Sequence, residues 1–240
     1  MYRELKETDN WLVIGPGRTG SLVIVNIIRN AYLNAGIQAY ERPHTDNATP
    51  ILEKQILHSH EINVLKLTNK NTTVVLNTRN PIEIVLSASI SEQNGVWHLW
   101  PKFWLDSKAW PAEQANKIQY NLSERESIDS AVEFSIKENY KAADVPIKPF
   151  YLDPEKFLSR YNSIVQFYRN IKHALPPNTI TIDYKEFKDD NSIIFNKLNL
   201  KPVETLVKPL PIKNAGNHQQ WISNWNEISN ICRRLSTATI

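Results

Sequence analysis

The chain has 240 residues, of which 41% are hydrophobic and 22% charged, and this is an ordinary balance for one substantial globular domain. Its formal net charge of +3 is too small to indicate a nucleic acid partner, although it is compatible with an anionic cofactor. The single cysteine, Cys232, excludes an internal disulfide framework, and no apolar stretch is long enough for a membrane span. We therefore expect one soluble, cytoplasmic domain over residues 1–240, without a membrane partner and with its oligomeric state open.

The first informative segment predicts a strand, a glycine-rich turn and a helix. Residues 12–14 form a short apolar run that suits a strand covered on both faces. The three glycines within residues 15–20 allow a tight turn and the close approach of a ligand. Residues 21–34 carry apolar side chains at helical spacing, and Gly36 fits the end of that helix. Backbone N–H groups and the helix dipole would form an anion site here, and a turn without a ligand is the alternative interpretation.

The glycine spacing fits the loop that binds nucleoside triphosphates, but the rest of that motif is missing. The position that needs lysine is occupied by Ser21, and the position that needs a magnesium-binding serine or threonine is occupied by Leu22. The positive charge lies earlier in the loop, at Arg18. We therefore expect the loop to hold an anion without a metal ion.

The second informative segment predicts a buried strand over residues 74–76, followed by a helix. Asn80 can cap that helix, and Pro81 lies at its favoured first position. Arg79 then lies at the carboxyl end of a strand, where open α/β sheets bind their ligands. Ser87 follows eight residues later, about two helical turns on, and could share one anion with Arg79. The alternative is a surface arginine and an ordinary helix serine.

The remaining elements include a second strand within residues 36–40 and a helical insertion over about residues 91–150. Four tryptophans lie within residues 95–110 and form either core or an acceptor-binding wall. Residues 123–142 predict a helix with a capping box, and another helix is expected to begin at Asp153.

Together the two anion segments resemble the sulfotransferase family that uses 3'-phosphoadenosine 5'-phosphosulfate (PAPS). In that family a loop like Arg18-Thr-Gly-Ser21 holds the 5'-phosphosulfate. A strand ending in Arg-Asn-Pro, here residues 79–81, with a serine eight residues after the arginine, holds the 3'-phosphate. The resemblance implies a three-layer α/β sandwich with a central parallel sheet, similar to the P-loop NTPases, plus the helical insertion.

The resemblance extends to two later segments. Residues 179–187 resemble a late family strand that would place Tyr184 near the adenine, and residues 192–200 resemble the short helix that follows. Residues 213–221 are similar to a C-terminal segment that closes over the 3'-phosphate. The implied ligands are PAPS as donor and adenosine 3',5'-bisphosphate (PAP) as product, with no metal. The implied cofactor contacts are Gly17, Arg18, Thr19, Gly20, Ser21, Leu22, Arg79, Ser87, Tyr184 and Lys213.

The proton acceptor is expected between the two anion segments. Residues 57–60 resemble the family's Lys-Thr-His segment, so that His60 matches the catalytic histidine and His58 the lysine. Imidazole titrates near neutrality, which suits a general base. Glu41 is an alternative, because other family branches use a glutamate in about that place, and His44 is another. The remaining alternative is that His58 and His60 are surface residues without a catalytic role.

The resulting prediction is in-line transfer of a sulfuryl group from PAPS to a hydroxyl or amine of a small molecule or carbohydrate. Arg18 would stabilise the charge that develops on the leaving group. A nucleotide or small-molecule kinase is one alternative. A non-catalytic module that binds a nucleotide or glycan on the same fold is the other.

Overall fold

The computed structural model describes residues 2–42, 50–94, 96–97, 100–101, 149–203 and 218–237. By compactness the chain divides into two units. The first comprises Met1–Ile84 and Asn162–Pro209, and the second comprises Val85–Tyr161 and Leu210–Ile240. Both anion segments, apart from Ser87, belong to the first unit. The prediction of a single domain stays a prediction.

A five-stranded sheet forms the centre of the first unit, and every neighbouring pair of its strands is parallel. The strand order is β2-β3-β1-β4-β7, so β1 lies in the middle of the sheet. The strands are β1 (Asn10–Ile14), β2 (Tyr40–Arg42), β3 (Gln55–Ser59), β4 (Thr72–Thr78) and β7 (Ile180–Asp183).

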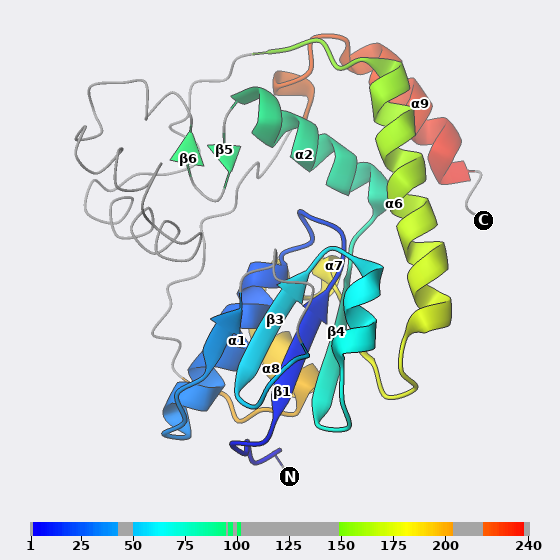
Figure 1. Ribbon diagram of the computed structural model, residues 1–240. Helices are drawn as coiled ribbons and strands as arrows, with labels where there is room; N and C mark the ends of the chain where they lie inside the picture. The colour runs from blue at the N-terminus through cyan, green and yellow to red at the C-terminus, as the bar shows by residue number, and fades with distance from the viewer. Residues whose placement is uncertain are drawn as a thin grey trace, which may run out of the picture. The chain divides into compact units, whose positions relative to one another are not determined.

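Helices cover both faces of this sheet because successive strand residues point to opposite sides. Val13 and Val75 pack against one apolar cluster, which includes α1 (Ser21–Asn34) and α8 (Ser192–Leu198). Leu12 and Leu76 pack against the other, with the 3-10 helix η1 (Ile62–Leu67) and the later part of α6 (Pro154–Ala174). Figure 1 draws α1 and α8 behind the sheet. The predicted three-layer α/β fold with a central parallel sheet is confirmed.

After the adjacent strands β1 and β4, the chain continues towards opposite edges of the sheet. From β1 it passes through α1 on one face to β2, and from β4 it returns to β7 through α6 on the opposite face. Parallel crossovers are right-handed, so a change of direction requires a change of face. Such a switch point opens a crevice at the carboxyl ends of the strands, where ligands of α/β proteins bind. The glycine loop and Arg79 follow these two strands.

Most predicted elements are observed close to their expected positions. The helix predicted at 21–34 is α1, and α2 (Pro81–Asn94) begins at its predicted proline, with the Asn80 side chain accepting a hydrogen bond of 2.9 Å from the backbone N–H of Ile82. The second strand begins only at Tyr40, so its prediction within 36–40 was wrong. The backbone N–H of Ile37 still bonds to the C-terminal turn of α1, and this bond delays the extended segment.

The second unit contains the later part of α2, the beginning of α6, and α9 (Trp225–Thr237). The side chain of Asn224 bonds to both the N–H and the carbonyl of Leu152, at 2.9 Å each, and joins the residues before α9 to those before α6. The predicted helix at 123–142 lies outside the described residues, as does most of the tryptophan-rich segment. Among the helices that are described, none has the length and apolar character needed to cross a membrane.

Tyr32 and Trp11 form a buried polar contact within the α1-side core. Both side chains are 0% exposed. The Tyr32 hydroxyl accepts a bond of 3.1 Å from Trp11 Nε1 and donates one of 2.9 Å to the Asp9 carbonyl. Burial raises the pKa of Tyr32 to about 12, because the charged phenolate would lose its hydration.

Replacing Tyr32 by phenylalanine should alter the pH dependence of unfolding. The pKa of the folded hydroxyl lies above its unfolded value, so its stabilisation is fully present below pH 10 and is lost as the pH rises towards about 12. Tyr32→Phe should therefore cost about 1–3 kcal/mol at neutral pH, since Trp11 Nε1 loses its acceptor. Urea unfolding between pH 7 and pH 12 should show a shallower alkaline decline for the variant. Parallel declines would contradict this assignment.

Candidate functional site

The glycine loop runs from Gly15 to Gly20 and fits closely between β4 and the residues after β7. A Cβ atom on Gly15 would collide with the carbonyl oxygen of Asn77, so no side chain fits there. Gly20 caps α1 with a φ of 82°, and a Cβ atom there would lie 3.0 Å from the Tyr184 ring. The loop backbone is therefore fixed by close packing on both sides.

A buried side chain from β4 anchors the middle of this loop. Asn77 donates from Nδ2 to the Thr19 carbonyl at 2.9 Å and to the Thr19 hydroxyl at 3.1 Å. The hydroxyl itself donates to the Pro16 carbonyl at 2.9 Å, and both Asn77 and Thr19 are 0% exposed. These bonds pre-organise the loop ahead of α1, where free N–H groups and the helix dipole attract anions.

Arg18 places a largely buried positive charge in this loop. Its backbone adopts a left-handed conformation, with a φ of 68°, which is uncommon for a residue that carries a side chain. Burial, followed by repulsion from the guanidinium of Arg79, lowers the pKa of Arg18 to about 10, and Tyr184 opposes these two effects. Arg18 remains charged at neutral pH, so a bound anion would relieve both costs.

Arg79 joins the loop to the end of β4. Its Nη1 donates to the Arg18 carbonyl at 2.9 Å, and its Nε pairs with Glu83 at 3.1 Å. The guanidinium lies over the Tyr184 ring, 4.2 Å from the ring centroid. Tyr184 therefore lies between Arg79 and the loop, and it supports the arginine with one face of its ring.

Two histidines from the end of β3 lie on the other side of the loop. His58 Nε2 is 2.7 Å from the Ser21 hydroxyl, and His60 Nδ1 is 2.7 Å from the Gly15 carbonyl. The two imidazole rings meet edge to face, with centroids 4.7 Å apart. Since a carbonyl only accepts, Nδ1 of His60 carries the proton and Nε2 is left as the basic nitrogen of the neutral ring. A Cβ atom on Gly17 would lie 4.0 Å from that Nε2.

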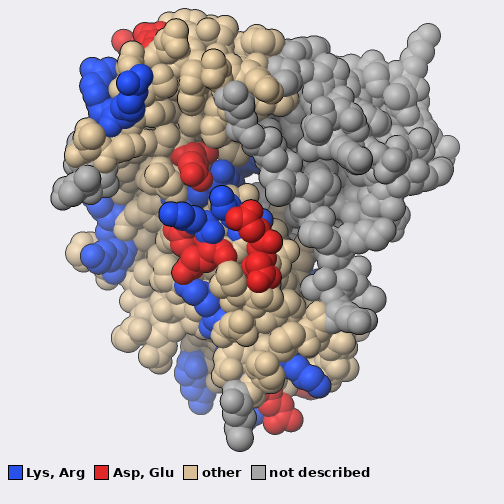
Figure 2. Space-filling view, turned by 180° about the vertical axis from the view of Figure 1, so that it is seen from behind, with Lys and Arg blue, Asp and Glu red and all other residues tan. Residues whose placement is uncertain are grey.

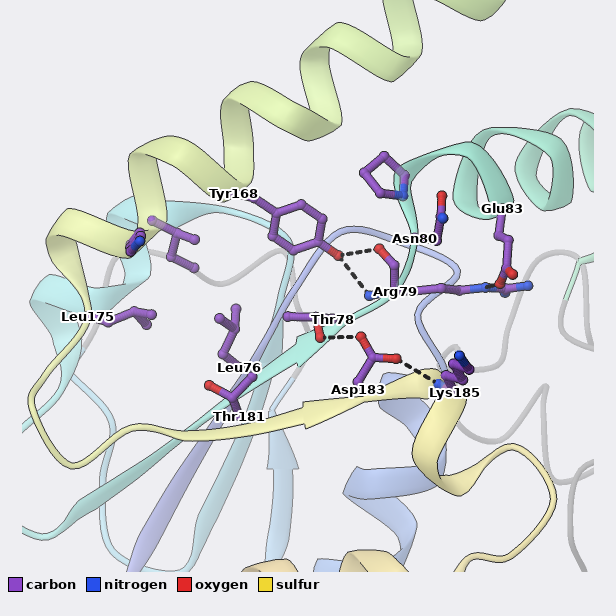
Figure 3. A pocket seen from close by; sticks show the side chains of 13 residues that line it. Leu76, Thr78, Arg79, Asn80, Glu83, Tyr168, Leu175, Thr181, Asp183 and Lys185 are labelled. Carbon is purple, nitrogen blue, oxygen red and sulfur yellow. Dashed lines mark hydrogen bonds and ion pairs between the residues drawn. The ribbon is translucent and has the colours of Figure 1, made fainter. Parts of the chain in front are cut away.

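A pocket of about 700 Å³ opens beside Arg79, at the carboxyl ends of β4 and β7. Figure 3 shows Tyr168 reaching from α6 to the backbone of Arg79, to which its hydroxyl is bonded at 3.1 and 3.2 Å. Below it, Thr78 donates to Asp183 at 2.8 Å. Both apolar and polar side chains line the pocket. The apolar ones are Leu76, Ile171 and Leu175, and the polar ones include Thr78, Asn80, Glu83, Lys172, Asp183 and Lys185.

The structure brings together most, though not all, of the predicted site residues. The loop residues, His60, Arg79 and Tyr184 meet at the switch point, and Leu22 is half-buried at the start of α1. Ser87 is buried on α2 in the second unit. Glu41 lies on β2, which β3 separates from β1. Lys213 and His44 lie outside the described residues.

Sequence reasoning missed three residues that organise this site, namely Asn77, Glu83 and Tyr168. A signal existed for Asn77, because a lone amide within an apolar strand run must find hydrogen-bond partners. No comparable signal marked Tyr168, which lies 89 positions after its partner Arg79.

Figure 2 shows basic and acidic side chains intermingled on the face that it draws. Within the described ranges, no group of three histidine, cysteine or acidic side chains is arranged to hold a metal ion. The positive character of the loop site comes from individual arginines and the helix N-terminus.

No protein-family model matches the chain, and no curated protein matches it in sequence. Two crystal structures are similar to it. One is retinol dehydratase with androsterone and inactive cofactor PAP, with 14% identity and a TM-score of 0.34 over 82% of this chain. The other is retinol dehydratase with retinol and PAP, also at 14% identity and a TM-score of 0.34, over 97% of this chain. The chain matches 60% and 65% of the lengths of those proteins.

The steric constraint on the loop predicts different costs for two glycine substitutions. Gly15→Ala should destabilise the protein by about 1–3 kcal/mol, because the new methyl group would collide with the backbone of Asn77. Gly17→Ala, its matched control, has only the His60 imidazole at 4.0 Å and should change stability by about 0.5 kcal/mol or less. Urea denaturation of both variants measures this difference, and equal costs would show that the loop is not held against β4.

Proposed function

We propose that this chain transfers a sulfuryl group from PAPS to a hydroxyl or amine of a small-molecule or carbohydrate acceptor. The observation that carries the proposal is the junction of two arginines at the switch point, one in the glycine loop and one at the end of β4. A ligand with two separate anionic groups matches two cationic positions that are linked by a direct hydrogen bond. The loop also lacks the lysine and the magnesium-binding hydroxyl that nucleoside triphosphates require.

The loop would hold the 5'-phosphosulfate of the donor. Backbone N–H groups at the start of α1 and the Arg18 guanidinium would offset the negative charge that develops on the bridging oxygen as its bond to sulfur breaks. Pre-organisation supports this role, because Asn77 and the packing of Gly15 and Gly20 fix the loop before a ligand arrives.

Arg79 would hold the 3'-phosphate. Glu83 pairs with Arg79, so a phosphate would compete with this carboxylate for the guanidinium. The Tyr184 ring packs against the guanidinium, and the pocket beside Arg79 offers space for the nucleoside.

His60 would act as the general base. Its Nδ1 is held by the Gly15 carbonyl, and the basic Nε2 lies near Gly17 of the loop. His60 would accept the acceptor's hydroxyl proton as the new sulfur–oxygen bond forms. Its position supports it over Glu41, whose strand is not adjacent to β1.

Ligand-dependent stabilisation tests the choice of cofactor. PAP at one hundred times its dissociation constant should stabilise the fold by about 2.7 kcal/mol. Magnesium-ATP should stabilise it distinctly less, because the loop lacks the metal-binding hydroxyl. Thermal unfolding with each ligand gives the comparison. A larger shift with magnesium-ATP would overturn the proposal, and PAPS binding without turnover on a panel of acceptors would leave a non-catalytic module.

Substitutions of the Arg79–Glu83 pair should act in opposite directions on PAP binding. Arg79→Ala should weaken PAP binding by about 10- to 100-fold, equivalent to about 1.5–3 kcal/mol, with a smaller effect on adenosine 5'-phosphate. Glu83→Gln should strengthen PAP binding up to about five-fold, since a half-exposed ion pair contributes about 0.2–1 kcal/mol. Isothermal titration of both nucleotides measures these changes. Equal effects on the two ligands would place Arg79 away from the 3'-phosphate.

Removing His60 should lower turnover far more than nucleotide affinity. His60→Ala should reduce the rate about 10²- to 10⁴-fold, the usual contribution of a general base, while PAP affinity stays nearly unchanged. Glu41→Gln and His44→Ala serve as parallel controls and should each cost less. If Glu41→Gln instead abolishes turnover while His60→Ala is active, the base is the carboxylate.

A further inference from the structure

The hydrogen bond between Ser21 and His58 links the first residue of α1 to a neighbouring strand. The two atoms, Ser21 Oγ and His58 Nε2, are 2.7 Å apart, and Ser21 is only 5% exposed. In the register of β1 and β3, His58 is paired with Val13, which belongs to the apolar cluster on the α1 side. Side chains of paired residues project from the same face of a sheet, and this brings the imidazole beneath the start of α1.

The direction of this hydrogen bond decides what the Ser21 hydroxyl can offer to a ligand. A serine hydroxyl has one proton to donate and two lone pairs that accept. If Ser21 donates to His58, no proton remains for an anion in the loop. If His58 donates from Nε2, Ser21 accepts that bond and its own proton is available for the anion.

An anion in the loop favours the second arrangement. Ser21 occupies the first position of α1, where N–H groups of the first turn already point towards the loop. A hydroxyl that donates into the same site adds a bond to a charged acceptor, which is stronger than a bond between neutral groups. Burial makes the pairing more valuable, because a buried hydroxyl without an ordered partner is costly.

We propose that His58 is a positioning residue: it donates from Nε2 to Ser21 Oγ and thereby directs the Ser21 hydroxyl proton to the 5'-phosphate group bound in the loop. The inference rests on the proposed function for the identity of the ligand. His58 then differs in role from its neighbour, since His60 bonds to the Gly15 carbonyl and is the residue proposed to accept the proton of the acceptor.

A double-mutant cycle tests this coupling. Ser21→Ala, His58→Ala and the double variant are titrated with PAP and with adenosine 3'-phosphate, which lacks the 5'-phosphate. Each single substitution should weaken PAP binding about ten-fold, and the double variant should bind no more weakly than either single one. Adenosine 3'-phosphate should bind all four proteins alike. Additive losses, or equal losses for both ligands, would overturn the proposal.

Two further variants separate positioning from a structural effect. His58→Gln keeps an N–H donor and should recover part of the lost PAP affinity, and it replaces His58→Ala in the cycle if that variant fails to fold. His173→Ala removes an exposed imidazole at the end of α6 and should bind PAP like the wild type. A glutamine variant as weak as the alanine variant would contradict a donor role.

A second ligand, inorganic pyrophosphate, tests the role of His58 separately from the proposed sulfotransferase function. If the wild type does not bind PAP, the proposed function fails, and the same four proteins are titrated with inorganic pyrophosphate. Coupled losses of pyrophosphate affinity would still support the role of His58. Additive losses, or no binding of pyrophosphate to the wild type, would overturn it.

Discussion

Arg79 donates a hydrogen bond to the carbonyl oxygen of Arg18, and this contact brings a charged side chain from the end of β4 to the loop that follows β1. One partner follows β1 and the other follows β4, the adjacent strands from which the chain departs in opposite directions. The topology of the sheet produces a crevice at this point, whereas the charge of the crevice depends on the side chains that line it. The bond brings a second guanidinium to the loop and sets the electrostatic character of the crevice.

Bringing two guanidinium groups together has an energetic cost that the surrounding residues offset. Burial and the positive charge of Arg79 lower the pKa of Arg18, which means that its charged form is held at an energetic cost. Glu83 pairs with Arg79 and the Tyr184 ring lies against it, which reduces that cost without filling the loop. An anion bound in the loop would therefore interact with these charges more strongly than an anion on an exposed surface.

The loop itself is held by contacts that do not depend on a ligand. Asn77 and the absence of a side chain at Gly15 fix its backbone against β4, and Gly20 fits against Tyr184. Donors that are already in place need not reorganise when charge develops, which is how electrostatic stabilisation accelerates a reaction. Two histidines at the end of β3 also contact the loop and the helix that follows it. His60 bonds to the backbone carbonyl of Gly15, and His58 bonds to Ser21, the first residue of α1.

The sequence alone determined the elements that depend on local chemistry. Apolar runs marked β1 and β4, glycines marked the loop, and the Asn80-Pro81 pair marked the start of α2, because caps and turns act over a few residues. Arg18 and Arg79 were identified together because each follows a buried parallel strand, and such strands end at one edge of a sheet. The second strand was misplaced because the backbone N–H of Ile37 still bonds to the carbonyl of Tyr32 in the last turn of α1, and β2 begins only at Tyr40.

Only the tertiary structure decided how these pieces meet. The contact of Tyr168 with Arg79 spans 89 positions, and the bond between His58 and Ser21 spans 37, so neither leaves a periodic signal in the chain. The sequence named Ser21 and His58 separately, but the register of β3 on β1 is what places the imidazole beneath the helix. Register depends on the packing of a whole sheet face, which no local pattern contains.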